Sequence, residues 1–272
     1  MLPKATYHDE RKRIANPHDK YVKAKKMILQ IAQRFQVRGR WTAGYRRIQA
    51  ELDKQELHLS GDTVRKLMGE LNVQVSLYNR HRSGKYSSYH GTVGKIAANK
   101  LNQEFNAHQP YQVIHTDVTQ VRLANHQWAY ISVMIDEASQ EILAFQLSTS
   151  PNKELIMRTL EELTDNLPDG AQPIIHSDQG WHYQLAYYTQ KLADYHFIQS
   201  MSRKGNCLDN APMESFFHLF KVESQPEIKK CKSISQFTQF FNKYVNWYNN
   251  DRISNKTKNM SPVDYRTHVL AA

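Results

Sequence analysis

The chain has 272 residues, 40% of them hydrophobic, and includes 15 Tyr, 10 Phe and 4 Trp. This length accommodates one sizeable core plus a smaller helical module, and this composition excludes a largely disordered chain. A net charge of +10 favours a polyanionic partner, although a merely soluble basic protein has the same composition.

The first 75 residues are predicted to be helical after a short leader. Residues 1–18 are polar and basic and are expected to be a flexible leader. Residues 19–75 have the apolar spacing of three helices, the third starting at Ser60 or Asp62 as N-cap. The segment HLSGDT joins the last two helices as in a helix-turn-helix, which would turn Arg65 and Lys66 outward as DNA-binding residues. The alternative is an ordinary helical hairpin with a solvated charged face.

Residues 76–109 are predicted to be a basic linker. No acid occurs from residue 71 to residue 103, whereas basic residues are interleaved with tyrosines there. Such segments follow a phosphate backbone and offer rings for base stacking. We therefore expect DNA contacts from Arg80, Arg82 and Lys85.

Residues 110–225 have the element order of an α/β core. Three short-linked strands, 111–122, 128–135 and 141–147, predict an antiparallel meander. A helix over 152–166, a strand ending at Asp178, a helix over 183–195 and a strand over 197–201 follow. Meander and then helix-strand alternation indicates a ribonuclease-H-like fold, a mixed five-stranded sheet flanked by helices, preceded by the small all-α module.

Two further helices are predicted beyond the sheet. A helix over 210–224 carries Glu214, with Asn210 as N-cap. A last helix within residues 226–272, the C-terminal helix and tail, has an aromatic stripe that is expected to pack on the core rather than form a ligand cage.

Three acids are the candidate catalytic residues. Asp117 and Asp178 are expected at two strand ends and Glu214 on a helix. Each alone has a structural explanation: a strand cap, a turn residue, or an acid at a helix N-terminus. Together they would meet at one sheet edge, where their repulsion implies Mg²⁺, with Mn²⁺ as a substitute. Two such ions would activate the attacking oxygen and stabilise the leaving oxygen of a phosphodiester displacement.

Other polar residues are assigned around these acids. His218 and Lys221 share the helix face of Glu214, and Arg203 and Lys204 precede that helix in a Gly-containing loop. All four are candidate DNA-binding residues. The acids Asp136, Asp169, Asp209 and Glu223 are expected to occupy turns and helix termini with no special setting.

The two cysteines, Cys207 and Cys231, form no CxxC pair, so no disulfide framework and no zinc site are expected. No apolar run approaches a membrane span, and the N-terminal residues have no signal-peptide core. The sequence predicts a soluble protein of a reducing cytoplasm with no membrane partner.

Several motifs carry a family resemblance. HTDVT, HSDQG, SMSRKGNCLDN, ESFF, and WYNNDR through SPVDYR resemble the integrase-like DDE transposases encoded by the downstream frame of two-frame bacterial insertion sequences. YRRIQAEL through TVRKLMGEL is similar to the helical module of that family, so the resemblance covers nearly the whole chain. The D, D(35)E spacing of the family is met, since 35 residues separate Asp178 from Glu214.

The resemblance implies that Asp117, Asp178 and Glu214 are a metal-binding catalytic triad. The family cuts one strand of double-stranded DNA at an element end and uses the 3′-hydroxyl for strand transfer. The resemblance also implies that the protein forms a homo-oligomer on DNA, is located at the bacterial nucleoid, and is fused to or paired with the upstream-frame product. Related retroviral integrases place DNA-contacting lysines where this chain has His218 and Lys221; their zinc module has no counterpart here.

Two other functions are compatible with parts of this sequence. One is a non-catalytic DNA-binding regulator that occupies element ends, which a core lacking one acid would favour. The other is a ribonuclease H-type nuclease, which would cleave without joining; the basic linker and helical front module favour a larger DNA substrate. Serine and tyrosine recombinases are disfavoured because no set of arginines surrounds a candidate nucleophile.

Overall fold

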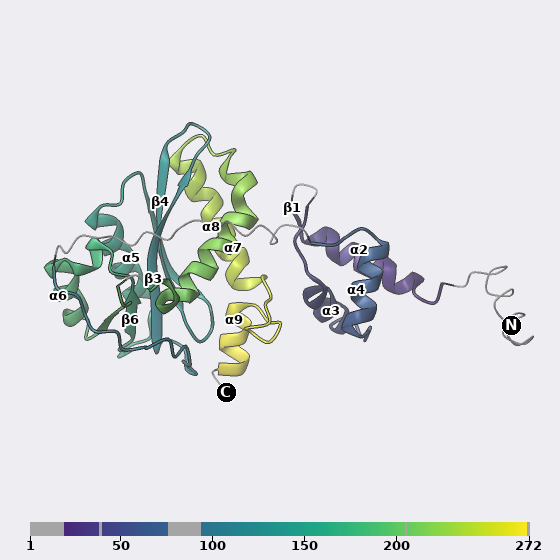
Figure 1. The fold of residues 1–272 in the computed structure, drawn as a ribbon, viewed down its shortest axis with the longest axis horizontal. Coiled ribbons are helices and arrows are strands. Elements are labelled where there is room, and N and C mark those ends of the chain that lie inside the picture. The colour runs from purple at the N-terminus through teal and green to yellow at the C-terminus, as the bar shows by residue number, and fades with distance from the viewer. Residues whose placement is uncertain (1–18, 38–39, 76–93, 205, 271–272) are drawn as a thin grey trace, which may run out of the picture. The chain divides into compact units, whose positions relative to one another are not determined.

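The computed structural model describes residues 19–37, 40–75, 94–204 and 206–270. The chain divides into two compact units, Met1–Asn79 and Arg80–Ala272, whose elements are drawn in Figure 1. The expected leader and the candidate DNA ligands Arg80, Arg82 and Lys85 lie outside the described residues. None of the described helices is long and apolar enough to cross a membrane.

The first unit is a bundle of three short helices. Helices α2 (Val22–Arg34), α3 (Tyr45–Asp53) and α4 (Gly61–Glu70) enclose one apolar core. Ser60 is the N-cap of α4, as predicted, because its hydroxyl accepts a hydrogen bond from the Thr63 amide. Strands β1 (Gln36–Val37) and β2 (Arg40–Trp41) pair between α2 and α3, and two-residue strands are too short to produce an alternating pattern in the sequence.

The second unit is built on a mixed five-stranded sheet of order β5-β4-β3-β6-β7, as predicted. Strands β3 (Val113–Arg122), β4 (Trp128–Asp136) and β5 (Ile142–Ser148) form the antiparallel meander. Strands β6 (Ile174–Ser177) and β7 (Ile198–Met201) continue the sheet on the other side of β3, parallel to it. The longest strand, β3, is therefore central.

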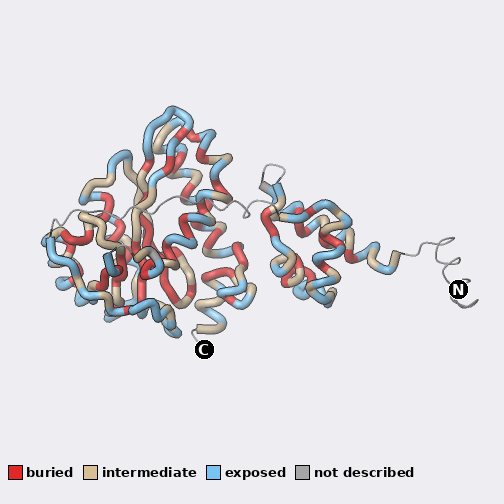
Figure 2. The backbone as a smooth tube through the Cα atoms, in the orientation of Figure 1, coloured by how far each residue is buried: buried red, intermediate tan, exposed pale blue. Residues whose placement is uncertain are grey.

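Helices cover both faces of this sheet. Helices α5 (Lys153–Asn166) and α6 (Ala186–Asp194) share one apolar core with the sheet, and α7 (Ala211–Ile228) and α8 (Ile234–Asn250) share the other. Side chains of β4 alternate between the two cores: Ile131 and Val133 face α7 and α8, whereas Met134 faces α5. Figure 2 shows the buried positions concentrated along the strands and the inward helix faces.

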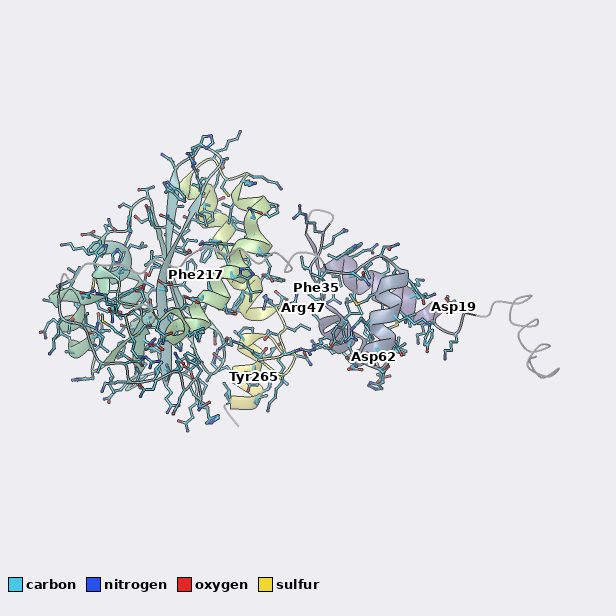
Figure 3. The ribbon with its side chains drawn as sticks, in the orientation of Figure 1. Asp19, Phe35, Arg47, Asp62, Phe217 and Tyr265 are labelled. Carbon is cyan, nitrogen blue, oxygen red and sulfur yellow. The ribbon has the colours of Figure 1, made fainter. Side chains whose placement is uncertain are left out.

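The aromatic stripe of α8 is part of the core, as predicted. Phe220 of α7 makes edge-to-face contacts with Phe241 and Tyr244 of α8, with both ring centroid distances at 5.0 Å. Phe217 of α7, labelled in Figure 3, is buried in the same cluster. A short helix α9 (Pro262–Tyr265) and the π-helical turn η3 (Arg266–Leu270) follow α8.

Three segments differ from the sequence-based expectation. The helix expected over 183–195 is split into a 3₁₀ turn η1 (Trp181–Gln184) and α6, because Leu185 is extended. The helix of Glu214 continues through Pro226 to residue 228. Residues 94–109, expected within a linker, run along the second unit, where backbone amides of Gly94, Lys100 and Ala107 donate to side chains of the core. Such backbone-to-side-chain contacts leave no periodic pattern in the sequence.

Candidate active site

Two neighbouring strands bring the first two acids to the same level of the sheet. His115 of β3 pairs in parallel register with His176 of β6, and β6 ends one residue before Asp178. Extending that register by two residues sets Asp178 level with Asp117. Asp117 is thus in the interior of β3, where the pairing with β6 stops, and not at a strand end as expected. The side chain of Asp117 is on the face of β3 that α7 covers, since Val121, four residues on, packs into that core.

The surroundings of Asp117 are electrostatically unfavourable for its charge. Burial raises the pKa of its carboxyl well above the usual range, and the negative charges of Asp178 and Glu214 raise it further. The Val118 amide, which donates to Asp117 Oδ1 at 2.7 Å, and the ammonium of Lys221 act in the opposite direction. The three predicted acids therefore belong to one electrostatic cluster.

Asp178 is held by the turn that follows β6. The Gly180 amide donates to Asp178 Oδ1 at 2.8 Å. A Cβ at Gly180 would lie 2.9 Å from that same oxygen, so the turn requires glycine for its close approach. Burial is the main cause that raises the pKa of Asp178, and the Gly180 bond and nearby His182 partly offset it. This acid is fixed in place by its own backbone.

Glu214 enters the cluster from the first turn of α7 and is exposed. Lys221 is seven residues further along the same helix face. Burial lowers the pKa of the Lys221 ammonium, and the charge of Asp117 raises it in part. The predicted grouping of Glu214 and Lys221 beside Asp117 is therefore present, and His218 is exposed on α7 between them.

The donor set suits a hard divalent cation. Carboxylate oxygens are the ligands that Mg²⁺ and Mn²⁺ prefer, and a divalent charge would offset the repulsion that raises the Asp117 pKa. Across the described part of the chain, no three His, Cys, Asp or Glu side chains converge closely enough to hold one ion. A two-ion site would not need that convergence, because each ion could be held by only two of the three carboxylates.

The other candidate DNA-binding residues differ in whether their side chains already bind an acid of the protein. Arg203 donates from Nε and Nη2 to Asp209, at 3.0 and 2.8 Å, so much of its guanidinium is already bound. Arg65 donates to Asp62 at 2.9 Å and lies over the ring of Tyr45.

Lys66 and Lys204 are exposed, and within the described part of the chain neither forms a hydrogen bond to an acidic side chain.

Three of the four acids expected to lack a special setting were misjudged. Asp209 is fully buried and also accepts from Asn99 and Gln103, at 2.9 and 2.7 Å. Asp136, the last residue of β4, is fully buried, and Glu223 is buried against Arg252. Each of these three acids has at least one partner more than 20 positions away, so the sequence next to the acid does not reveal its burial.

The structure also gives two buried polar residues near the acids, Asn210 and His115, contacts that the sequence analysis did not predict. Asn210 is at the start of α7, but it makes no side-chain cap, contrary to the prediction. Its amide instead contacts His115 and the carbonyl of Thr116 on β3. The one sequence signal was the repeated His two positions before each strand acid, His115 before Asp117 and His176 before Asp178.

Acids from β3, from the end of β6 and from a covering helix, on a ribonuclease-H-like sheet, define an integrase-type catalytic core. Comparison with family models agrees: integrase core domain models match residues 107–207 and 214–270, and an HTH-like domain model matches residues 23–82. The helix-turn-helix interpretation of the first unit is thereby confirmed.

Curated relatives extend over most of the chain. The putative transposase InsK for insertion sequence element IS150 of Escherichia coli is 35% identical over 98% of this chain and 91% of its own length. An uncharacterized transposase-like protein of Haemophilus influenzae is 42% identical over 72% of this chain and 89% of its own length. The chain belongs to the integrase-like DDE transposases of bacterial insertion sequences, of the IS3 type.

A solved structure agrees on the fold. The simian T-cell lymphotropic virus intasome in complex with the PP2A regulatory subunit B56 gamma has a chain that aligns with a TM-score of 0.51 at 12% identity, covering 82% of this chain and 70% of that one. From its family membership, the protein is a transposase that acts on DNA by polynucleotidyl transfer, and that family is metal-dependent. The regulator and nuclease alternatives are not favoured.

Proposed function

We propose that Asp117, Asp178 and Glu214 together hold two Mg²⁺ ions, or Mn²⁺ in their place, and that this site cuts and joins DNA at the ends of an insertion element. The observation that carries the proposal is the placement of the acids. The β3–β6 register sets Asp178 level with Asp117, and α7 adds Glu214 on the same side. When bound, such ions supply an activated attacking oxygen and charge stabilisation for the leaving oxygen.

Residues around the site would hold the two aspartates in place and balance their charge. Asp117 and Asp178 are held by backbone amides at 2.7 and 2.8 Å, so their oxygens have little freedom when DNA arrives. Lys221, beside Asp117, balances part of the negative charge and offers an ammonium to a DNA phosphate. The attacking group is water in strand cleavage and a DNA 3′-hydroxyl in strand transfer, with no covalent protein-DNA intermediate.

DNA contacts are proposed along both units. Lys66 and Arg65 of α4 would meet duplex DNA, and the basic segment with Arg80, Arg82 and Lys85 would follow its backbone. Nearer the acids, the candidates are Lys204, His218 and Lys221. Arg203 would reach a phosphate only through the donors that Asp209 leaves over.

The domain boundaries, partners and location are also proposals. Residues 19–75 would read DNA, residues 110–225 would catalyse, and residues 226–272 would brace the catalytic helix through α8. A homo-oligomer on DNA would hold two element ends together, and the upstream-frame product would be fused to or paired with this chain. It would act in the bacterial cytoplasm on nucleoid DNA.

The test is cleavage and joining of labelled element-end DNA with Mg²⁺ or Mn²⁺ by the wild-type chain, by Glu214→Gln and by Ser215→Ala. The serine is the next residue of α7 and is also exposed, so its variant controls for disturbance of the helix. Metal-dependent nicking and joined products from wild type and Ser215→Ala, but not from Glu214→Gln, support the proposal.

Three results would count against it. Activity that survives in Glu214→Gln removes that acid from the mechanism. If wild type binds end DNA but never cuts it, even when fused to the upstream-frame segment, the chain acts as a regulator instead. Cleavage without joining would indicate a nuclease.

A further inference from the structure

One amide side chain ties the start of the catalytic helix to the strand that carries Asp117. Asn210 precedes α7 by one residue and Glu214 by four, and it is only 4% exposed. Its Nδ2 donates to the carbonyl oxygen of Thr116 at 3.2 Å, and its Oδ1 is 3.1 Å from His115 Nδ1. Both contacts fall on the two residues of β3 immediately before Asp117.

The direction of each hydrogen bond in this contact is fixed. A carbonyl oxygen only accepts, so the amide nitrogen of Asn210 must face Thr116. The amide oxygen then faces His115, whose Nδ1 must be the donor. His115 Nε2 is 2.7 Å from Glu137 Oε2, and Glu137 Oε1 accepts from the Ala107 amide at 2.9 Å. Glu137, His115 and Asn210 are therefore joined in one continuous chain of hydrogen bonds.

Burial makes this chain stiff. His115 is fully buried and Glu137 is 7% exposed, so water cannot readily replace a lost partner. The ring of His115 also packs edge-on against that of His176, with centroids 5.4 Å apart, and His176 is two residues before Asp178. This group of side chains therefore contacts the residues just before Asp117 on β3, the residue two positions before Asp178, and the residue just before α7.

We propose that Glu137, His115 and Asn210 are positioning residues that set Glu214 against Asp117 for shared binding of a divalent cation; the inference rests on the function proposed above. Glu214 is exposed in the first turn of its helix, so its distance from β3 depends on how that turn is anchored. Asn210 supplies the polar anchor. Residues that orient metal ligands typically contribute about 10–100-fold to metal affinity or activity.

The experiment measures Mn²⁺ affinity of the full chain by electron paramagnetic resonance titration, for wild type, Asn210→Ala and Asn249→Ala. Asn249 is a matched control because its amide likewise links a helix to the sheet, bonding the backbone of Ile142 from α8 at 3.0 and 2.9 Å. Both substitutions are expected to lower the unfolding midpoint. Only Asn210→Ala is expected to weaken Mn²⁺ affinity, by about tenfold or more.

A conservative variant sharpens the result. Asn210→Asp keeps an acceptor for His115 and loses the donor to Thr116, so its Mn²⁺ affinity should fall between wild type and Asn210→Ala. If Asn210→Ala does not fold, Glu137→Leu is measured in its place, because it keeps a side chain of similar size and removes the acceptors for the Ala107 amide and for His115. It is expected to weaken Mn²⁺ affinity in the same direction.

Three outcomes would overturn the inference. Wild-type Mn²⁺ affinity in folded Asn210→Ala, or in Glu137→Leu where that variant stands in, means that the network does not position Glu214. Equal weakening in Asn249→Ala means that any loss of helix anchoring has the same effect. Failure of the wild type itself to bind Mn²⁺ would remove the proposed catalytic site as well, so the two failures are distinguishable.

Discussion

Asp209 and Asp117 belong to the same unit and have opposite electrostatic surroundings. Asp209, just before α7, accepts hydrogen bonds from Arg203, Asn99 and Gln103, and the Arg203 guanidinium holds its pKa well below the usual range. Asp117, in the middle of β3, accepts one backbone hydrogen bond, and its pKa is raised first by burial and then by two neighbouring acids. The charge of Asp209 is balanced by an arginine of the same chain, whereas Asp117 lies among other negative charges. The second arrangement is typical of sites that bind a cation.

The same contrast extends to Glu223. Its carboxylate accepts from Arg252 at 3.1 Å and from the Tyr244 hydroxyl at 3.0 Å, all within the α7–α8 core. Glu214 is on the same helix, nine residues earlier, and its negative charge contributes to raising the pKa of Asp117. One helix therefore carries a structural acid near its end and a candidate catalytic acid in its first turn.

The largest expected effect comes from Asp117→Asn. Removing one ligand takes away several kcal/mol of charge stabilisation, so Mg²⁺-dependent cleavage of element-end DNA should fall by on the order of 10³-fold. The metal-free protein should unfold at an equal or higher urea concentration, because the substitution relieves repulsion. If the variant lost activity only in proportion to its unfolded fraction, Asp117 would be a structural acid like Asp209 and not a metal ligand.

Asp209→Asn should lower stability and leave the cleavage activity of the folded protein unchanged. It removes a buried charge whose partner, Arg203, is half exposed, so the free energy of unfolding should fall by about 2–3 kcal/mol. Urea unfolding followed by circular dichroism measures this, with the exposed turn acid Asp169→Asn as control. A wild-type midpoint for Asp209→Asn would show that its hydrogen bonds contribute little.

The stabilisation by Asp209 should also depend on pH. Its pKa is lowered in the folded state, so its contribution is fully present above the unfolded value of about 3.9 and is lost as pH falls below that. The difference in stability between wild type and Asp209→Asn should thus be constant from neutral pH down to about pH 4 and should shrink in stronger acid. A difference that grows toward acid pH would contradict the assignment of the charge.

The smallest expected effect is that of Lys221→Gln. If Lys221 meets one phosphate, DNA affinity should weaken uniformly across sequences, and the slope of log affinity against log salt should decrease by about one. Lys243→Gln, an exposed lysine on α8, is the control. An unchanged slope for Lys221→Gln would assign that ammonium to charge balance at Asp117 alone.

Much of the second unit could be predicted from sequence because its signals are local. The alternating strands and the spacing of apolar residues in the helices each depend on residues close in sequence, as the Ser60 cap does in the first unit. The order of those elements selected the sheet topology, and the motifs around Asp117, Asp178 and Glu214 drew attention to the acids before any geometry was known.

The rest depends on contacts between distant residues. Asp209 is separated by more than 100 positions from Asn99 and Gln103. Asn210 reads as a helix cap in sequence, yet β3 offers its amide a buried carbonyl and a histidine instead. Residues 94–109 have no apolar period, because they bind the core mainly through backbone amides. No local pattern encodes these pairings.

The most direct test of the account follows cleavage and stability in the same samples of wild type, Asp178→Asn and Asp209→Asn. Element-end DNA with Mg²⁺ reports cleavage, and urea unfolding reports the folded fraction. The account predicts that Asp178→Asn is folded and inactive, whereas Asp209→Asn is destabilised and cuts in proportion to its folded fraction. Normal cleavage by folded Asp178→Asn would contradict the assignment of the acids.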